Sequence, residues 1–181
     1  MSSGGTDYTV RPTLVLGWGN EWRGDDAVGR VAARAIAAEC RTQVEVADIH
    51  QLTPEWACTI AAHGRVIFLD ALRQATEVQV SRLTASPTDN AHTAHRVAPD
   101  YLLALAATCY NAHPVAWLIG IPVQDFTMGA PLSSVAQRGV AVAVAACRRL
   151  LPDVVAPPIV PEFASDESPL LPQSTFAERS A

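Results

Sequence analysis

Short apolar runs alternate with segments of helical periodicity along most of this chain of 181 residues. The runs with the length and composition of strands are 13–16, 44–49, 65–70, 77–83 and 115–121. Helices are expected from Asp25 to about Cys40, after Pro54, from Pro99 to about Tyr110, and from Ser133 to Leu151. Such an order is typical of a mostly parallel sheet. The sequence therefore predicts an α/β fold, a three-layer sandwich with a twisted sheet of roughly five strands and helices on both faces.

Two of these strands differ in pattern. Residues 65–70 form a continuous apolar run, as expected for a parallel strand that is covered on both faces. Residues 77–83 alternate between apolar and polar side chains, which indicates an edge strand with one wet face.

The chain has the size of one domain, and its content of 49% apolar and 17% charged residues is sufficient for one core. We assign the α/β domain to residues 12–151. Residues 1–11 are interpreted as a disordered lead-in, and residues 152–181 as a proline-rich, acidic tail without a second domain.

Charge and composition argue against several classes of partner. The net charge is −5, with 13 basic and 18 acidic residues, which argues against nucleic acid or an anionic membrane as partner. The N-terminus does not resemble a secretory signal, and the longest apolar stretch is too short to span a bilayer. The four cysteines form no CxxC motif, so reduced thiols and a cytoplasmic location are expected.

The turn after the first strand contains glycines but lacks both the GxGxxG and the P-loop spacing. The next helix opens with Asp25 and Asp26, where a phosphate would need free amides and a positive dipole end. Two carboxylates there attract a cation instead. Either aspartate can also serve as a helix cap while its neighbour points into a crevice.

Asp70 ends the most hydrophobic strand. Ligands of open α/β sheets bind beyond the carboxyl ends of the strands, and parallel pairing would bring Asp26 and Asp70 to the same edge. The simpler alternative is that Asp70 caps the following turn. His95, in a polar loop before the third helix, is a third candidate, with His92 as its competitor. Two carboxylates and an imidazole suit a divalent ion such as zinc or nickel and leave positions open for a substrate.

The motifs together resemble the hydrogenase maturation proteases. Residues 17–29 (GWGNEWRGDDAVG) are similar to the family's opening G-x-G-N-x-x-x-x-D-[DE]-x-x-G, and the resemblance continues through Asp70-Ala71, Ala94-His95, residues 118–121 and Leu132-Ser133. It covers residues 13–151 in order and spacing. Thr93 stands where the family commonly has a serine, two residues before the histidine.

The resemblance implies an endopeptidase that removes the C-terminal extension of the large-subunit precursor of a [NiFe] hydrogenase. It places the metal-contacting and catalytic roles on Asp26, Asp70 and His95. It also implies that nickel arrives in the Cys-rich site of the substrate and is not held permanently by the protease. The expected partner is the precursor alone, and the protease is expected to be a monomer.

After the second strand, many family members have Asp-Gly-x-Thr, which is implicated in the choice of substrate. This chain has His50, Gln51 and Leu52 there, followed by Glu55, and so resembles a branch with a His-Gln-Leu motif. These residues are expected to bind the substrate. Two other functions remain open at this point: a nickel-site checkpoint or chaperone that binds the precursor without cutting it, and a conventional metallo-hydrolase that holds its own zinc.

Overall fold

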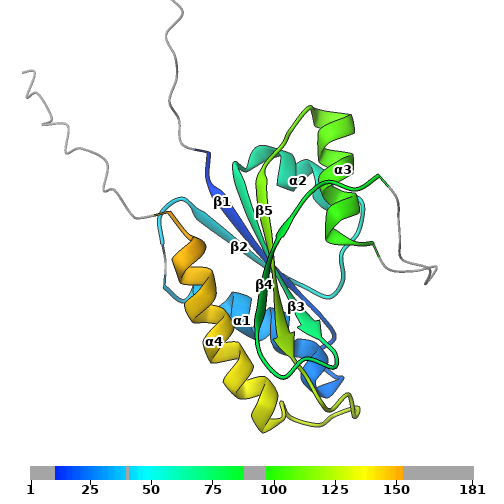
Figure 1. The fold of residues 1–181 in the computed structure, drawn as a ribbon, viewed down its shortest axis with the longest axis vertical. Coiled ribbons are helices and arrows are strands. Elements are labelled where there is room, and N and C mark those ends of the chain that lie inside the picture. Colours follow the sequence, from blue (N-terminus) through cyan, green and yellow to red (C-terminus); the bar gives the residue numbers. More distant parts are fainter. Residues whose placement is uncertain (1–10, 40, 88–96, 153–181) are drawn as a thin grey trace, which may run out of the picture.

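The computed structural model describes residues 11–39, 41–87 and 97–152, which form one sheet with helices on both sides (Figure 1). The strands are β1 (Thr13–Trp18), β2 (Val44–Ile49), β3 (Arg65–Leu72), β4 (Gln79–Leu83) and β5 (Val115–Pro122). The helices are α1 (Val28–Ala37), α2 (Trp56–Ala62), α3 (Pro99–Tyr110) and α4 (Ser134–Leu150). A 3-10 turn, η1 (Gly24–Ala27), precedes α1. The predicted lead-in and tail lie almost entirely outside the described residues.

The strand order is β2-β1-β3-β5-β4. Strands β2, β1, β3 and β5 are parallel, whereas β4 pairs antiparallel with β5 at the edge of the sheet. The predicted α/β class and the predicted edge strand are both confirmed. β4 is mostly exposed, in keeping with its alternating pattern, whereas Val66 to Leu69 of β3 are fully buried.

Two hydrophobic clusters cover the two faces of the sheet. Helices α1 and α4 pack against each other on one face, and α2 packs against α3 on the other. Because side chains alternate along a strand, Ile67 contributes to the cluster under α1 and α4, and Phe68 to the cluster under α2 and α3. This arrangement is the predicted three-layer sandwich.

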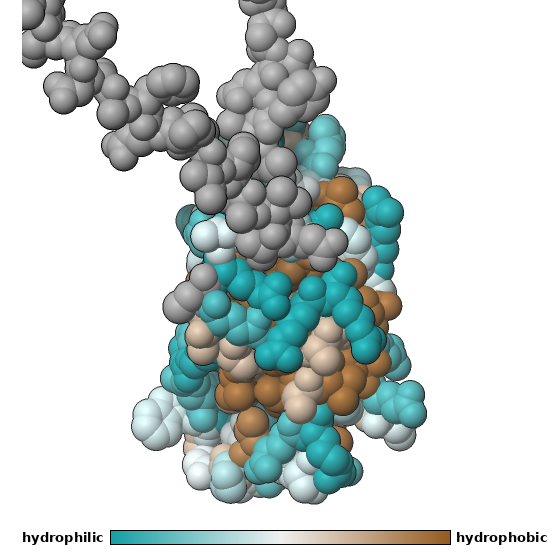
Figure 2. All heavy atoms as spheres, turned by 90° about the vertical axis from the view of Figure 1, so that its left-hand side faces the viewer, coloured by the Kyte–Doolittle hydropathy of each residue, from teal (hydrophilic) through white to brown (hydrophobic). Residues whose placement is uncertain are grey.

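Figure 2 shows the left-hand side of Figure 1, where α4 lies. Hydrophobic side chains gather in the middle of this face and are bordered by hydrophilic ones. Val142 of α4 is an exposed hydrophobic residue.

None of the described helices is long and apolar enough to cross a membrane.

The order of the strands places a topological switch point between β1 and β3. From β1 the chain moves outward to β2, and from β2 it returns across β1 to pair as β3 on the opposite side. The connections on either side of this point therefore leave the sheet in opposite directions. In open parallel sheets, such a switch point is where ligands bind, at the carboxyl ends of the strands.

Candidate functional site

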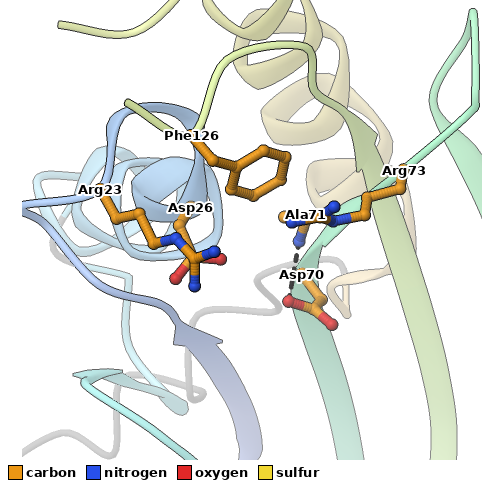
Figure 3. A pocket seen from close by; sticks show the side chains of 6 residues that line it. All are labelled: Arg23, Asp26, Asp70, Ala71, Arg73 and Phe126. Atoms are coloured by element: carbon orange, nitrogen blue, oxygen red, sulfur yellow. Dashed lines mark hydrogen bonds between the residues drawn. The ribbon is translucent and has the colours of Figure 1, made fainter. Parts of the chain in front are cut away.

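A pocket of about 200 Å³ lies at the carboxyl ends of the central strands. Its lining residues are Arg23, Asp26, Asp70, Ala71, Arg73 and Phe126. Figure 3 shows Asp26 on one side of the pocket, Asp70 on the side formed by β3, and the ring of Phe126 above them. The predicted meeting of Asp26 and Asp70 at one edge of the sheet is thus confirmed, and their chemical roles stay predictions.

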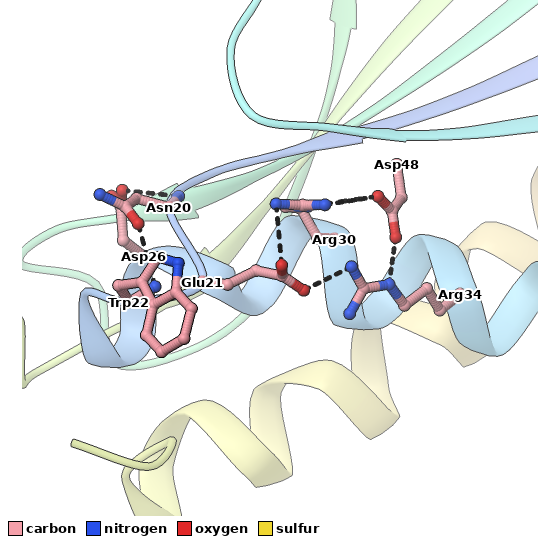
Figure 4. Close-up of polar contacts among 7 residues, drawn as sticks. All are labelled: Asn20, Glu21, Trp22, Asp26, Arg30, Arg34 and Asp48. Atoms are coloured by element: carbon pink, nitrogen blue, oxygen red, sulfur yellow. Dashed lines mark hydrogen bonds and ion pairs between the residues drawn. The ribbon is translucent and has the colours of Figure 1, made fainter. Parts of the chain in front are cut away.

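The turn between β1 and η1 holds the carboxylate of Asp26. The backbone N–H of Asn20 donates to Oδ2 of Asp26 at 3.0 Å (Figure 4). Gly19 has a φ of +142°, and a Cβ built there would lie 1.7 Å from the carbonyl oxygen of Asp26. Only glycine fits this close approach, so the glycine of the turn determines where Asp26 sits.

Gly29, in the first turn of α1, brings the helix into contact with the sheet. A Cβ at this position would lie 2.3 Å from the carbonyl oxygen of Leu69 and 2.6 Å from that of Trp18. These two oxygens belong to β3 and β1, which pair with each other. The start of α1 therefore packs directly onto both strand ends, which places Asp26 opposite Asp70.

Asp25 has a structural part in the site although it does not line the pocket. Its carboxylate is fully buried and accepts hydrogen bonds from the backbone N–H groups of Gln124, Asp125 and Ser133, and from the hydroxyl of Ser133, at 2.6–3.0 Å. Burial by itself would raise the pKa of Asp25, but these donors outweigh it and lower the pKa below its ordinary value. Asp25 thus ties the loop after β5 to the loop after β1.

Ser133 completes this connection. It is the N-cap of α4, and its Oγ accepts a hydrogen bond from the backbone N–H of Ala136 at 3.2 Å. The same hydroxyl donates to Asp25 at 2.7 Å. One side chain therefore caps α4 and anchors it to the site.

Asp70 lies in β3, opposite Gly120 of β5 in the register of the sheet. Its Oδ1 accepts a hydrogen bond from the backbone N–H of Ala71 at 2.8 Å. Such a contact accords with the simpler alternative, in which Asp70 stabilises the following backbone. Since Asp70 also lines the pocket, this contact and a role toward a ligand are compatible.

Two arginines frame the pocket through Phe126. The guanidinium carbon of Arg73 lies 4.0 Å from the centre of the Phe126 ring, and that of Arg23 lies 5.7 Å from it. Both distances are within the range of cation–π contacts. The three residues come from three different loops, after β1, β3 and β5, which the ring of Phe126 brings together at the rim.

A network of charges supports the same turn from outside the pocket (Figure 4). Arg30 of α1 contacts Asp48 at 2.8 Å and Glu21 at 3.3 Å, and Arg34 pairs with the same two carboxylates. Burial tends to raise the pKa of Asp48, but the hydrogen bonds from Arg34 and Arg30 outweigh burial and lower the pKa. The network joins the end of β2, helix α1 and the turn that carries Asp26.

The predicted substrate-binding residues lie on the segment after β2, beside this turn. The backbone N–H of Gly19 donates to the carbonyl oxygens of Ile49 and His50, each at 3.2 Å. His50, Gln51 and Glu55 are exposed, but they are not part of the pocket lining. Leu52 is buried in the cluster under α2 and α3, so its side chain is part of the core. Binding of substrate by this segment stays a prediction.

The third predicted metal ligand, His95, lies outside the described residues, as does its competitor His92. Among the residues that the structure describes, no group of three or more His, Cys, Asp or Glu side chains could hold a metal ion. Asp26 and Asp70 supply carboxylate oxygens, which are ligands for divalent cations. The two described members of the predicted set of three donors therefore fit a metal that obtains its other ligands elsewhere.

Sequence reasoning did not identify Arg23, Arg73 and Phe126 as pocket residues. Arg23 lies within the glycine-rich opening motif, and Arg73 follows Asp70 by three residues, so nearness to a predicted carboxylate was a signal for both. Phe126 lies in a loop without periodicity, and no local pattern indicates its position.

The fold is similar to that of solved hydrogenase maturation proteases. HycI, a [NiFe] hydrogenase maturation protease from Thermococcus kodakarensis, matches with a TM-score of 0.65 and 18% identity, over 79% of this chain and 94% of that one. HybD, a hydrogenase maturating endopeptidase from E. coli, matches with a TM-score of 0.59 and 19% identity, over 77% and 93% of the two chains. A hydrogenase 2 maturation peptidase from a Thaumarchaeota archaeon matches with a TM-score of 0.58 and 22% identity, over 77% of this chain and 97% of that one.

At these identities, the likeness establishes a shared fold. No family model matches the sequence, and no curated protein matches it either. The chain therefore has the α/β fold of the hydrogenase maturation proteases, with two carboxylates in a pocket at its topological switch point.

Proposed function

We propose that this chain is an endopeptidase that removes the C-terminal extension of a [NiFe] hydrogenase large-subunit precursor. The observation that carries the proposal is the pair Asp26 and Asp70 in one pocket between β1 and β3, in a fold shared with solved maturation proteases. The motif over residues 17–29, read from the sequence alone, points to the same activity.

In this proposal, nickel belongs to the substrate. Asp26 and Asp70 would contact it from the two sides of the pocket, and His95 would supply the third contact. A site of this kind recognises the nickel-loaded precursor, because the metal holds the peptide in register. The carboxylates suit either of two roles, as ligands that position the metal beside the scissile carbonyl or as a general base for an attacking water.

The test is to incubate the protein with hydrogenase large-subunit precursors, with and without nickel, and to follow the precursor mass. We expect loss of a C-terminal peptide only from the nickel-loaded precursor. Asp26→Asn, Asp70→Asn and His95→Ala should each abolish this loss while the variants remain folded. A precursor that matches the protein and is never cleaved would contradict the proposal.

Glu39→Gln is a matched control, because Glu39 follows the opposite end of α1 and pairs with Arg41 and Arg148. This variant should process the precursor at the normal rate. Nickel-dependent binding of the precursor without loss of mass would instead identify a checkpoint or chaperone. Tight, stoichiometric zinc in the purified protein would favour a metallo-hydrolase with its own metal.

A further inference from the structure

The pocket is lined by charges of both signs. Asp26 and Asp70 supply carboxylates from η1 and β3, and Arg23 and Arg73 supply guanidinium groups, with Phe126 between the two arginines (Figure 3). A pocket of this kind fits a ligand that is itself cationic at one point and anionic at another. The nickel of the proposed substrate accounts for the cationic point only.

Among the described residues, no ion pair neutralises the charge of Arg23 or Arg73. Within the described parts of the chain, neither Arg23 nor Arg73 forms an ion pair, although Arg30, Arg34 and Arg148 all do. Their close neighbour is instead the ring of Phe126, at 5.7 Å from Arg23 and 4.0 Å from Arg73. The positive charges are therefore present at the pocket and remain available to a ligand.

Contact with an aromatic ring leaves the guanidinium able to bind an anion. Arginine stacks through the face of its planar group, and its N–H donors point outward in that plane, in a fork that matches a carboxylate. The ring also limits the motion of a long side chain, which reduces the entropy that binding would cost. The partly exposed ring of Phe126 thus supports the guanidinium groups of both arginines at one rim of the pocket.

The ligand must also be able to reach this rim. Trp22 is 75% exposed and Met128 is 70% exposed. Trp22 directly precedes Arg23, and Met128 follows Phe126 by two residues, on the two loops that contribute to the pocket. The loops are joined by the backbone N–H of Gly129, which donates to the carbonyl oxygen of Trp22 at 2.8 Å. Two exposed apolar side chains therefore lie on the loops that carry Arg23 and Phe126, so these loops are accessible to a peptide.

We propose that Arg23 and Arg73 are specificity-determining residues that bind a carboxylate of the peptide substrate beside the two aspartates. The carboxylate is either an acidic side chain or the free C-terminus of the peptide. This inference rests on the proposed function in taking a peptide as the ligand, but it requires neither nickel nor cleavage. It predicts that a carboxylate in the peptide increases its affinity for the protein.

The experiment uses the peptide host acetyl-Gly-Gly-Xaa-Gly-Gly in four forms, with Asp or Asn at Xaa and a free or amidated C-terminus. Each is titrated at low ionic strength into ¹⁵N-labelled protein, and the side-chain Nε–Hε resonances of the arginines are followed by NMR. We expect peptides with the recognised carboxylate to bind about tenfold more tightly than the Asn amide, as for a charge-assisted contact. The Asp peptide with an amidated C-terminus carries only the side-chain carboxylate, and the Asn peptide with a free C-terminus carries only the terminal one. Comparing these two peptides shows which carboxylate the protein recognises.

Arg23→Gln and Arg73→Gln should abolish this preference, and Phe126→Leu should reduce it although both arginines remain. Arg82→Gln is the matched control, because Arg82 lies 6.0 Å from the Trp117 ring toward the other end of the sheet and has the same charge change. Equal affinity of the normal protein for all four peptides, including no binding, would overturn the inference. So would a preference that survives both Gln variants. Either result leaves the test of precursor cleavage unaffected.

Discussion

Asp25 and Asp26 are adjacent and carry the same side chain, but the fold gives them opposite surroundings. Asp25 is fully buried among donors from the loop after β5, and Asp26 lines the pocket. The position of each follows from the η1 turn, which directs the two side chains to different sides. One aspartate therefore contributes to stability, and the other is free to contribute to function.

The two aspartates should respond differently to the same substitution. Asp25→Asn places an amide against backbone N–H donors, so we expect a loss of about 2 kcal/mol in the free energy of unfolding at pH 7. Asp26→Asn can still accept from Asn20, and its loss should stay below about 1 kcal/mol. Urea denaturation followed by circular dichroism gives both values, and equal losses would contradict this assignment.

The effect of Asp25 should also depend on pH. Because the pKa of Asp25 is lowered in the fold, its contribution to stability is fully present above the ordinary value of 3.8. This contribution is lost as the pH falls through the lower pKa of the folded protein. The difference in stability between the normal protein and Asp25→Asn should therefore shrink when the measurement is repeated below that range.

At the scale of elements, the distance between α1 and the sheet determines the site. The backbone of α1 lies against the carbonyl oxygens of β1 and β3 at Gly29, where a methyl group does not fit. The network of Glu21, Arg30, Arg34 and Asp48 connects the same helix to the end of β2. Helix, turn and strand ends are thus held together around the carboxylates.

Gly29→Ala should push α1 away from the strand ends. We expect a loss of about 1–3 kcal/mol in the free energy of unfolding, as for other overpacked positions, together with slower processing of the precursor. Gly139→Ala in α4 is the comparison, because its methyl group would meet side-chain carbons of Ile121 and Pro122 at 2.9–3.2 Å. Both glycines lie in helices, so alanine gains helix propensity at either position. The side chains at Gly139 can shift, whereas the backbone carbonyl groups at Gly29 are fixed by the sheet, so the loss should be smaller at Gly139. A larger loss in Gly139→Ala than in Gly29→Ala would contradict the argument.

At the scale of the whole molecule, both hydrophobic clusters share one sheet. Ile67 and Phe68 are neighbours in β3, fully buried, and belong to opposite clusters. Loss of packing on either face therefore weakens the strand that both faces require. The described core should unfold as one cooperative unit.

Ile67→Ala and Phe68→Ala test this coupling. Removal of buried side chains of these sizes costs about 2–5 and 3–5 kcal/mol, respectively. Each variant should still unfold in a single transition that coincides by circular dichroism and tryptophan fluorescence. Two separate transitions, or a change confined to one probe, would show that the faces unfold independently.

Much of this architecture could be predicted from local pattern. Continuous and alternating apolar runs identified the buried β3 and the edge strand β4, because these patterns record how many faces of a strand are covered. The meeting of Asp26 and Asp70 was also predictable, since the carboxyl ends of parallel strands lie at one edge. The role of His95 stays a prediction from the sequence.

The rest was decided by tertiary structure. Asp25 forms hydrogen bonds with residues that lie between 99 and 108 positions further along the chain. Arg23, Arg73 and Phe126 meet only because three loops converge at one pocket. Periodicity reports whether a side chain faces the core, but it carries no information on which distant loops come together. The sequence by itself therefore determined the sheet and the edge at which the site lies, whereas the packing of α1 and the loops onto that edge determined which side chains form the pocket.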